Sequence, residues 1–260
     1  MIKKEKRLCS ICNNRSEYFL TKTILKKYKV KYFRCTKCHF IETEKPRYWL
    51  KEAYSSAIID ADTGIIKRNQ MFSTISALVF LLLCEKNSKV LDYAGGYGIM
   101  TRMLRDIGID CYWEDKYAEN IFAKHFIGSK RNKYEMVTAF EFFEHADDPV
   151  KVIGGVIHKY SPNIFLFSTE LHDGNPPKDW WYFAESGGQH ISLYTRESLD
   201  IMAKKFNLYY STDGKGIHIF SKQRVSPIII KTISVIWPIC GIFLPLFYKS
   251  KTFSDHLLLK

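Results

Sequence analysis

The sequence predicts an α/β protein built on a doubly wound, mostly parallel sheet, with a small N-terminal cysteine-rich ribbon and an apolar C-terminal tail. Between residues 65 and 168, segments with helical spacing of apolar residues alternate with short apolar runs of strand length. The first run leads into a glycine-rich loop and then directly into a helix, an order typical of such sheets. Two C-x2-C pairs distinguish the first 45 residues.

Positive charge is concentrated in the N-terminal ribbon. The first 51 residues carry 15 Lys and Arg against 4 Asp and Glu. The remaining residues carry 24 of the chain's 39 basic residues and 23 of its 27 acidic residues. Such a module can bind nucleic acid, anionic lipid or a phosphorylated substrate. The charged start of the chain lacks the apolar core of a secretory signal, so we expect a cytoplasmic location in which cysteines stay reduced.

The cysteines of the ribbon have the spacing of a metal site. Cys9 and Cys12 form one C-x2-C pair, and Cys35 and Cys38 form a second one, with 22 residues between the pairs. Four thiolates suit tetrahedral structural Zn²⁺, and a module this small needs such a ligand because it buries little apolar surface. Short apolar runs at 18–20 and 29–33 predict the strands of a zinc ribbon.

Residues 46–88 are expected to form a linker or lid and then a leading helix. Residues 54–59 predict a short lid element, and Asp62-Thr63-Gly64 predicts a turn that starts a helix. Apolar residues then recur at helical spacing from Ile65 to Cys84. This helix should therefore pack on the sheet.

The glycine-rich loop follows the first predicted strand. Asp92 ends that strand, and Gly95, Gly96 and Gly98 precede a helical run. Glycine permits positive φ and lets a ligand approach the backbone, while the N-terminus of a helix offers N–H donors. A nicotinamide dinucleotide is excluded, because Thr101 stands where its G-x-G-x-x-G fingerprint requires glycine.

Three further strands, at 109–114, 136–140 and 163–168, complete the parallel part of the sheet. Asp115 follows the first of them, and an acid at this place can accept hydrogen bonds from both hydroxyls of a ribose. Glu114 is the competing candidate, because strand ends are uncertain by a residue or two.

A long loop at 172–192 breaks the alternation of helices and strands. It contains several glycines and prolines together with Trp180, Trp181, Tyr182 and His190. An aromatic loop at the carboxyl edge of a parallel sheet favours a ligand pocket. Beyond it, Thr195 caps a helix, and a hairpin at 208–221 closes the sheet.

The tail from 227 to 248 contains an uncharged stretch that Pro238, Gly241 and Pro245 interrupt. A membrane-spanning helix needs about 20 apolar residues, so this stretch is too short and too broken to span. Flanking lysines favour peripheral contact of 227–248 with a membrane surface. A dimer-forming or domain-capping segment is the alternative.

With these residues in view, the chain resembles a class I S-adenosylmethionine-dependent methyltransferase. The resemblance rests on the loop Leu91–Gly98, on Asp115, and on the segment Thr138–His145 followed by Asp148-Pro149. Gly188–Thr195, together with the four cysteines, resembles a subgroup found among bacterial surface-glycan biosynthesis enzymes. The loop departs from the family pattern D-x-G-x-G-x-G at Ala94, which costs little if φ is negative at that position.

The resemblance implies a Rossmann-like methyltransferase sheet and a division of the chain into four segments. These are a zinc-ribbon-like module (1–45), the linker or lid with its leading helix (46–88), an S-adenosylmethionine-binding domain (89–223) and the tail (224–260). The cofactor-binding residues that it implies are Asp92, Ala94, Gly95, Gly96, Gly98, Asp115 and Phe140.

The implied reaction is O-methylation of a sugar, a sugar nucleotide or a related small molecule. A base must take the proton of an acceptor hydroxyl, and histidine is the usual choice. His190 is the preferred candidate and His145 the second, followed by Glu170 and His172. A nucleic-acid methyltransferase that binds through the basic ribbon, or a non-catalytic scaffold, is the alternative.

Overall fold

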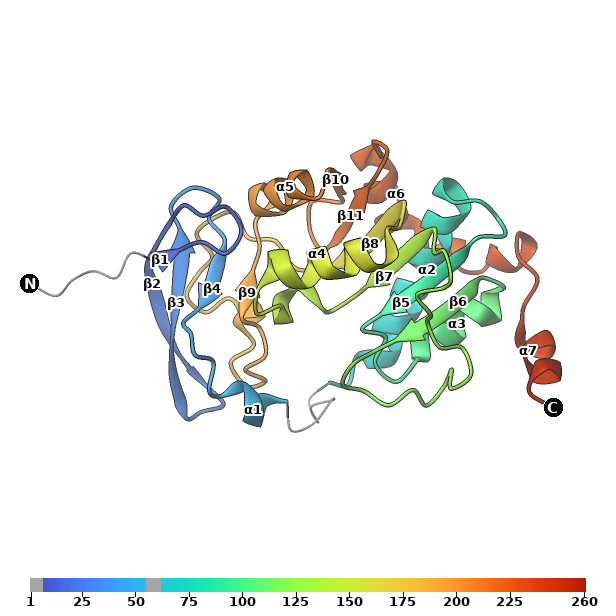
Figure 1. The fold of residues 1–260 in the computed structure, drawn as a ribbon, viewed down its shortest axis with the longest axis horizontal. Helices are drawn as coiled ribbons and strands as arrows, with labels where there is room; N and C mark the ends of the chain where they lie inside the picture. The colour runs from blue at the N-terminus through green and yellow to red at the C-terminus, as the bar shows by residue number, and fades with distance from the viewer. Residues whose placement is uncertain (1–6, 55–61) are drawn as a thin grey trace, which may run out of the picture.

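Two β-sheets organise the computed structural model, which describes residues 7–54 and 62–260 (Figure 1). The larger sheet has the strand order β10-β11-β8-β7-β5-β6. Four strands run parallel, whereas β10 and β11 are antiparallel, so the sheet is mixed. Its strands are β5 (Lys89–Tyr93), β6 (Asp110–Glu114), β7 (Met136–Ala139), β8 (Ile164–Ser168), β10 (Tyr209–Thr212) and β11 (Ile217–Ser221).

Helices cover both faces of the larger sheet, which confirms the predicted α/β class. Consecutive strand residues belong to different cores: Val90 packs with α2, α3 and α6, whereas Leu91 packs with α4 and α5. This burial on both faces explains why the strands have continuous apolar runs. The helices are α1 (Leu50–Ala53), α2 (Ile65–Leu83), α3 (Ile99–Ile107), α4 (Pro149–Tyr160), α5 (Arg196–Lys205), α6 (Pro227–Cys240) and α7 (Thr252–Leu258), with 3-10 turns η1 (Phe143–His145), η2 (Trp181–Phe183) and η3 (Leu244–Leu246).

The smaller sheet joins the N-terminal module to the rest of the chain. Its strands follow the order β1-β2-β3-β4-β9. Ile41 pairs with Leu193 and Glu42 with Ser192, so the module extends into the segment just before α5. The strands are β1 (Arg7–Leu8), β2 (Arg15–Ile24), β3 (Tyr28–Cys35), β4 (Ile41–Thr43) and β9 (Ser192–Leu193).

The segment between the module and α2 is described only in part. The predicted lid at 54–59 falls largely on residues 55–61, which lie outside the described residues. The predicted helix begins at Ile65, but Gly64 at its start makes no side-chain cap. Instead, the Asp62 carboxylate accepts two hydrogen bonds from the Arg68 guanidinium, at 2.8 and 2.7 Å.

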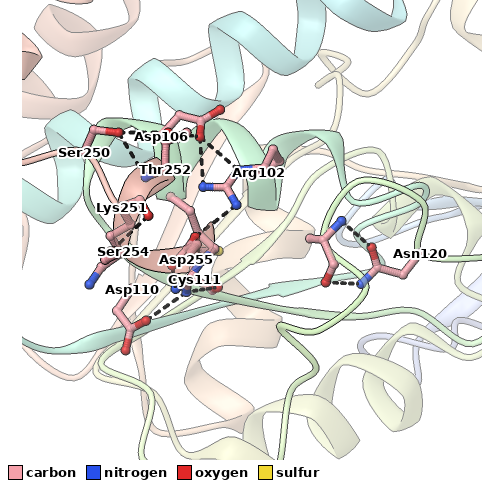
Figure 2. A network of polar contacts seen from close by, with 12 residues as sticks. Arg102, Asp106, Asp110, Cys111, Asn120, Ser250, Lys251, Thr252, Ser254 and Asp255 are labelled. Atoms are coloured by element: carbon pink, nitrogen blue, oxygen red, sulfur yellow. Dashed lines mark hydrogen bonds and ion pairs between the residues drawn. The ribbon is translucent and has the colours of Figure 1, made fainter. Parts of the chain in front are cut away.

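The C-terminal segment folds back onto α2, α3 and the larger sheet. Ile230, Ile233 and Leu244 are buried in the same core as α2. A second attachment lies beside α3, where Arg102, Asp106, Thr252 and Asp255 form a polar network (Figure 2). In the part of the chain that the structure describes, none of the helices combines the length and hydropathy needed to cross a membrane.

Candidate functional site

The loop between β5 and α3 turns through three left-handed residues. Ala94, Gly96 and Gly98 have φ values of 56°, 52° and 82°. Two of them are glycines, for which this region carries no steric penalty, but Ala94 is strained. The sequence-based condition of negative φ at Ala94 is therefore not met.

Crowding explains why Gly95 and Gly98 have no side chain. A Cβ on Gly95 would lie 2.7 Å from Oδ2 of Asp92 and 2.8 Å from the Trp113 ring. A Cβ on Gly98 would lie 2.5 Å from Oδ1 of Asn120. Gly96 differs, because a Cβ there would meet no atom within 4 Å. The loop therefore leaves backbone accessible at Gly96.

Asp92 lies buried beneath the loop. Its carboxylate accepts hydrogen bonds from Thr101 Oγ1 at 2.9 Å and from Thr138 Oγ1 at 3.2 Å. Burial raises the pKa of Asp92 to about 7, although these two hydroxyls oppose the shift. Thr101 and Thr138 were missed by sequence reasoning, because their proximity depends on α3 and β7 meeting at β5.

The carboxylate of Asp115 faces the loop, whereas that of Glu114 does not. Gly96 N–H donates to Oδ2 of Asp115 at 3.0 Å, and two further N–H groups, of Tyr117 and Ala118, donate to Oδ1. Glu114 instead accepts hydrogen bonds from Lys159 and Tyr160 of α4. Glu114 contacts the loop through its backbone carbonyl, which accepts a hydrogen bond from Gly95 N–H at 3.3 Å, so of the two competing carboxylates that of Asp115 contacts the glycine loop and that of Glu114 does not.

Phe140, the remaining predicted cofactor contact, lies just beyond β7. Its ring stacks on Phe72 of α2, with centroids 4.2 Å apart and planes 10° apart, and it is buried. The side chain is thus engaged with the helix, and a direct role beside a cofactor stays a prediction.

The two preferred histidines lie together. His145 ends η1 and His190 precedes β9, and their ring centroids are 5.2 Å apart. Burial lowers the pKa of His145 to about 3 and that of His190 to about 4. Both imidazoles are therefore neutral at pH 7. The buried carboxyl of Glu144 belongs to the same group, a proximity that the Glu-His pair in the sequence could have indicated.

The lower-ranked candidates, Glu170 and His172, lie between the end of β8 and the start of the long loop. Nδ1 of His172 accepts a hydrogen bond from Gly174 N–H at 3.1 Å, and burial lowers the pKa of His172 to about 4. Glu170 lines a cleft of about 260 Å³. The structure thus separates these two side chains from the pair formed by His145 and His190.

The cleft lies where α2, the end of β8 and the long loop meet. Trp181 and Tyr182 line it together with Glu141 and Arg68. Trp181 is 70% exposed, whereas Tyr182 is buried and its ring contacts His190 at a centroid distance of 4.5 Å. Tyr182 therefore stands between the cleft and the histidine pair.

The four cysteines of the N-terminal module converge as predicted. Their sulfur atoms all lie within 4.8 Å of one another, with 3.7 Å between Cys9 and Cys38 and 3.4 Å between Cys12 and Cys35. Backbone N–H groups point at two of the sulfurs, which stabilises thiolates. The hydrogen bond with Cys38 lowers the pKa of Cys9 to about 6. This donor set fits a tetrahedral Zn²⁺ ion.

Several solved structures align with part of the chain. The structure of TnmH aligns with a TM-score of 0.46 and 15% identity over 67% of this chain and 61% of TnmH, so the chain spans about three fifths of that protein. Magnesium protoporphyrin IX methyltransferase (ChlM) from Synechocystis PCC 6803 with bound SAH aligns with a TM-score of 0.43 and 12% identity, over 67% of this chain and 91% of that one. The structure of mitomycin 7-O-methyltransferase MmcR aligns with a TM-score of 0.42 and 12% identity, over 68% of each chain.

No curated protein sequence matches the chain. The family model described as a methyltransferase domain matches residues 67–212, which is more than half of the 260 residues. This match covers the glycine loop, Asp115 and both histidines. The chain therefore belongs to the methyltransferase domain family.

Proposed function

We propose that the protein is an S-adenosylmethionine-dependent methyltransferase that acts on a hydroxyl of a sugar or a related small molecule in surface-glycan biosynthesis. The observation that carries the proposal is the glycine loop joined to Asp115 through Gly96 N–H. Family membership supports the reaction class. The acceptor class and the pathway rest on the sequence resemblance.

The loop fits the cofactor because it offers a side-chain-free surface. The methionine portion would lie against Gly95, Gly96 and Gly98. Asp115 accepts three backbone hydrogen bonds, and a carboxylate with about four lone-pair sites can accept a further one from a ribose hydroxyl. Asp92 orients the loop from below through Thr101. When bound, the cofactor supplies a methyl group on a positively charged sulfur.

His190 is the proposed base for the acceptor hydroxyl. Its Nδ1–H donates to the Tyr182 carbonyl oxygen at 2.7 Å, so the lone pair of the neutral ring is on Nε2. The lone pair can accept a proton, and the Tyr182 side chain, which contacts His190 and lines the cleft in which we place the acceptor, has to move aside for the two to meet. The exposed indole of Trp181 offers an apolar face to a sugar ring.

The N-terminal module has a structural role in this proposal. We propose that Cys9, Cys12, Cys35 and Cys38 hold Zn²⁺, and we keep the division at residues 45, 88 and 223 as a working proposal. The pairing of β4 with β9 then makes the zinc module a support for the segment that carries His190.

The tail is proposed to contact the inner face of the cytoplasmic membrane. Its apolar stripe consists of Val235 and Ile239 on α6 and of Ile242 and Leu246 in the turns after that helix, all of them 65–79% exposed. Lysines at 231, 249 and 251 flank this apolar stripe and would attract anionic lipid.

Calorimetric titration with S-adenosylmethionine tests the proposed cofactor. We expect the wild type to bind, and Asp115→Asn to weaken binding by about tenfold to a hundredfold, because hydrogen bonds to a charged group are each worth about 1.5–3 kcal/mol. Glu114→Gln is the matched control, since the Glu114 carboxylate bonds to α4 instead of the loop. Absence of binding in the wild type would favour a non-catalytic scaffold.

The acceptor is tested in a deletion strain. Mass spectrometry of its surface glycans should show the loss of one methyl (CH2) increment, restored by the wild-type gene. A normal glycan spectrum together with tight, salt-sensitive binding of RNA or DNA by the purified protein would favour a nucleic-acid substrate.

A further inference from the structure

A second group of metal-ligand side chains lies next to the proposed acceptor site. Glu144, His145 and His190 each place one ligand atom within 4.8 Å of the others. Glu144 and His145 belong to η1, while His190 comes from a segment some 45 residues later. Ile191 N–H donates to the Glu144 carbonyl oxygen at 2.9 Å and holds the two segments together.

Glu144 carries an unexplained buried carboxyl group. The residue is 0% exposed, and neither carboxylate oxygen has a hydrogen-bond partner among the described residues. A buried polar group without a partner is costly, and an unpaired buried charge is more so. A cation bound here would supply the partner that both oxygens lack.

Each of the two imidazoles is oriented by a backbone carbonyl group, as is typical of metal-binding histidines. Nδ1 of His145 lies 3.1 Å from the Gln189 carbonyl oxygen, and Nδ1 of His190 lies 2.7 Å from that of Tyr182. A backbone carbonyl on one ring nitrogen fixes the tautomer and leaves the Nε2 lone pair for a cation. Both rings lie at 81° to each other, so their lone pairs can approach one point from different directions.

We propose that Glu144, His145 and His190 bind one divalent transition-metal ion, separate from the ion of the four cysteines. One carboxylate and two imidazoles suit Mn²⁺, Fe²⁺, Co²⁺ or Zn²⁺ and leave coordination positions open. The consequence for catalysis rests on the proposed function: an acceptor hydroxyl that took an open position on the ion would lose its proton to solvent water more readily. In the metal-bound form the ion, and not His190, then activates the hydroxyl.

Metal binding is measured on the full chain with its cysteine site loaded with zinc. Mn²⁺ is the probe, because it prefers oxygen and nitrogen ligands to thiolates. Electron paramagnetic resonance should show one bound Mn²⁺ per chain, and elemental analysis should count it in addition to the cysteine-bound zinc.

Glu144→Gln and His190→Asn should each weaken Mn²⁺ binding by about tenfold or more, since loss of even an outer-shell partner costs 10–100-fold. Glu170→Gln and His172→Asn are the matched controls and should bind Mn²⁺ as the wild type does. Unchanged zinc content and unchanged circular dichroism show that each variant is folded.

Two results would overturn the proposal: no stoichiometric Mn²⁺, Co²⁺ or second Zn²⁺ in the wild type, or equal binding by all four variants. Calorimetry with S-adenosylmethionine separates this outcome from failure of the proposed function. Cofactor binding without the second metal rejects the metal site alone, whereas metal binding without cofactor binding rejects the methyltransferase assignment alone.

Discussion

Ala94 has a backbone conformation that alanine rarely adopts. Its φ of 56° lies in the left-handed region, which costs a residue with a Cβ about 1–2 kcal/mol. Ala94→Gly removes this strain. The glycine also gives the unfolded chain more conformational entropy, which destabilises the folded state by about 0.5–1 kcal/mol. We expect the free energy of unfolding to rise by about 0.5–1 kcal/mol, measured by urea denaturation.

Ala118→Gly is the control for this prediction. Ala118 lies in a loop, and its φ is outside the left-handed region. The same substitution should therefore lower stability there through the entropy of the unfolded state. A loss of stability in Ala94→Gly would show that the loop is not strained at this residue.

At the scale of single residues, the sequence could predict those features that depend only on residue type and spacing. The four cysteines were found because their spacing alone predicts convergence. The left-handed φ of Ala94 could not be predicted, because it depends on how the loop closes between β5 and α3. The orphan carboxylate of Glu144 was also missed, because burial of both its oxygens requires the later segment that carries His190.

At the scale of elements, α7 is attached to α3 by a buried ion pair. The Arg105 guanidinium donates to both oxygens of Asp255, at 2.8 and 2.7 Å, and to Asp110 at 2.9 Å. Arg105 and Asp255 are 3% and 2% exposed. No sequence pattern pairs residues 150 positions apart, so this contact could not be predicted.

Asp255→Asn should destabilise the protein by about 1.5–3 kcal/mol at pH 7, because the buried Arg105 loses its hydrogen bonds to a charged carboxylate and keeps Asp110 as its remaining acidic partner. Burial opposes ionisation, but the hydrogen bonds and charges of Arg105 and Arg102 outweigh it and lower the pKa of Asp255 below its ordinary value. A lowered pKa stabilises the fold above the unfolded-state pKa of about 3.9, and this stabilisation is lost as pH falls through the folded-state pKa.

The difference between wild type and Asp255→Asn should therefore shrink in urea titrations below about pH 4. Asp106→Asn is the matched control, because Asp106 pairs with Arg102 at the surface, where such pairs contribute at most about 1 kcal/mol. Equal effects of the two variants at pH 7 would contradict a special role for the buried pair.

The pairing of β4 with β9 predicts that the cysteine site stabilises a distant loop. Cys35→Ser, or removal of zinc by a chelator, should speed amide hydrogen exchange over 188–195 while exchange at β5 stays slow, since sheet edges open locally when their partner strand is lost. Cys84→Ser, at a cysteine outside the cluster, should leave both regions unchanged. Unaltered exchange over 188–195 would mean that β9 holds its place without the module.

For the whole molecule, the distribution of apolar surface predicts where it binds. The tail lies at the opposite end from the basic N-terminal module (Figure 1). Purified protein should co-sediment with vesicles that contain anionic lipid, and binding should weaken when Val235 and Ile239 are both changed to Glu, because each loses buried apolar area and adds repulsion.

Leu8→Glu is the control for vesicle binding, since Leu8 is 60% exposed but belongs to the N-terminal module. If both variants weaken vesicle binding equally, the tail is not a specific membrane-binding site. Concentration-dependent dimerisation abolished by the tail variant, without vesicle binding, would assign the apolar stripe to a second copy of the chain.

The α/β class and the positions of the parallel strands along the chain were predictable at this scale, because strands buried on both faces give continuous apolar runs between helical segments. The ribbon strands at 18–20 and 29–33 were also predictable and lie in β2 and β3. The extension of their sheet to β9 was not, because β9 is only two residues long and its partner is some 150 residues earlier.

That two-residue strand limits how the protein can be recombined. A module that shares a sheet with its neighbour cannot be exchanged as a separate unit, since its edge at Ile41–Thr43 has to fit the backbone of Ser192–Leu193. A chimera with a foreign N-terminal module would retain the glycine loop but lose the strand partner of β9. Among related enzymes, these two short segments should therefore be inherited together.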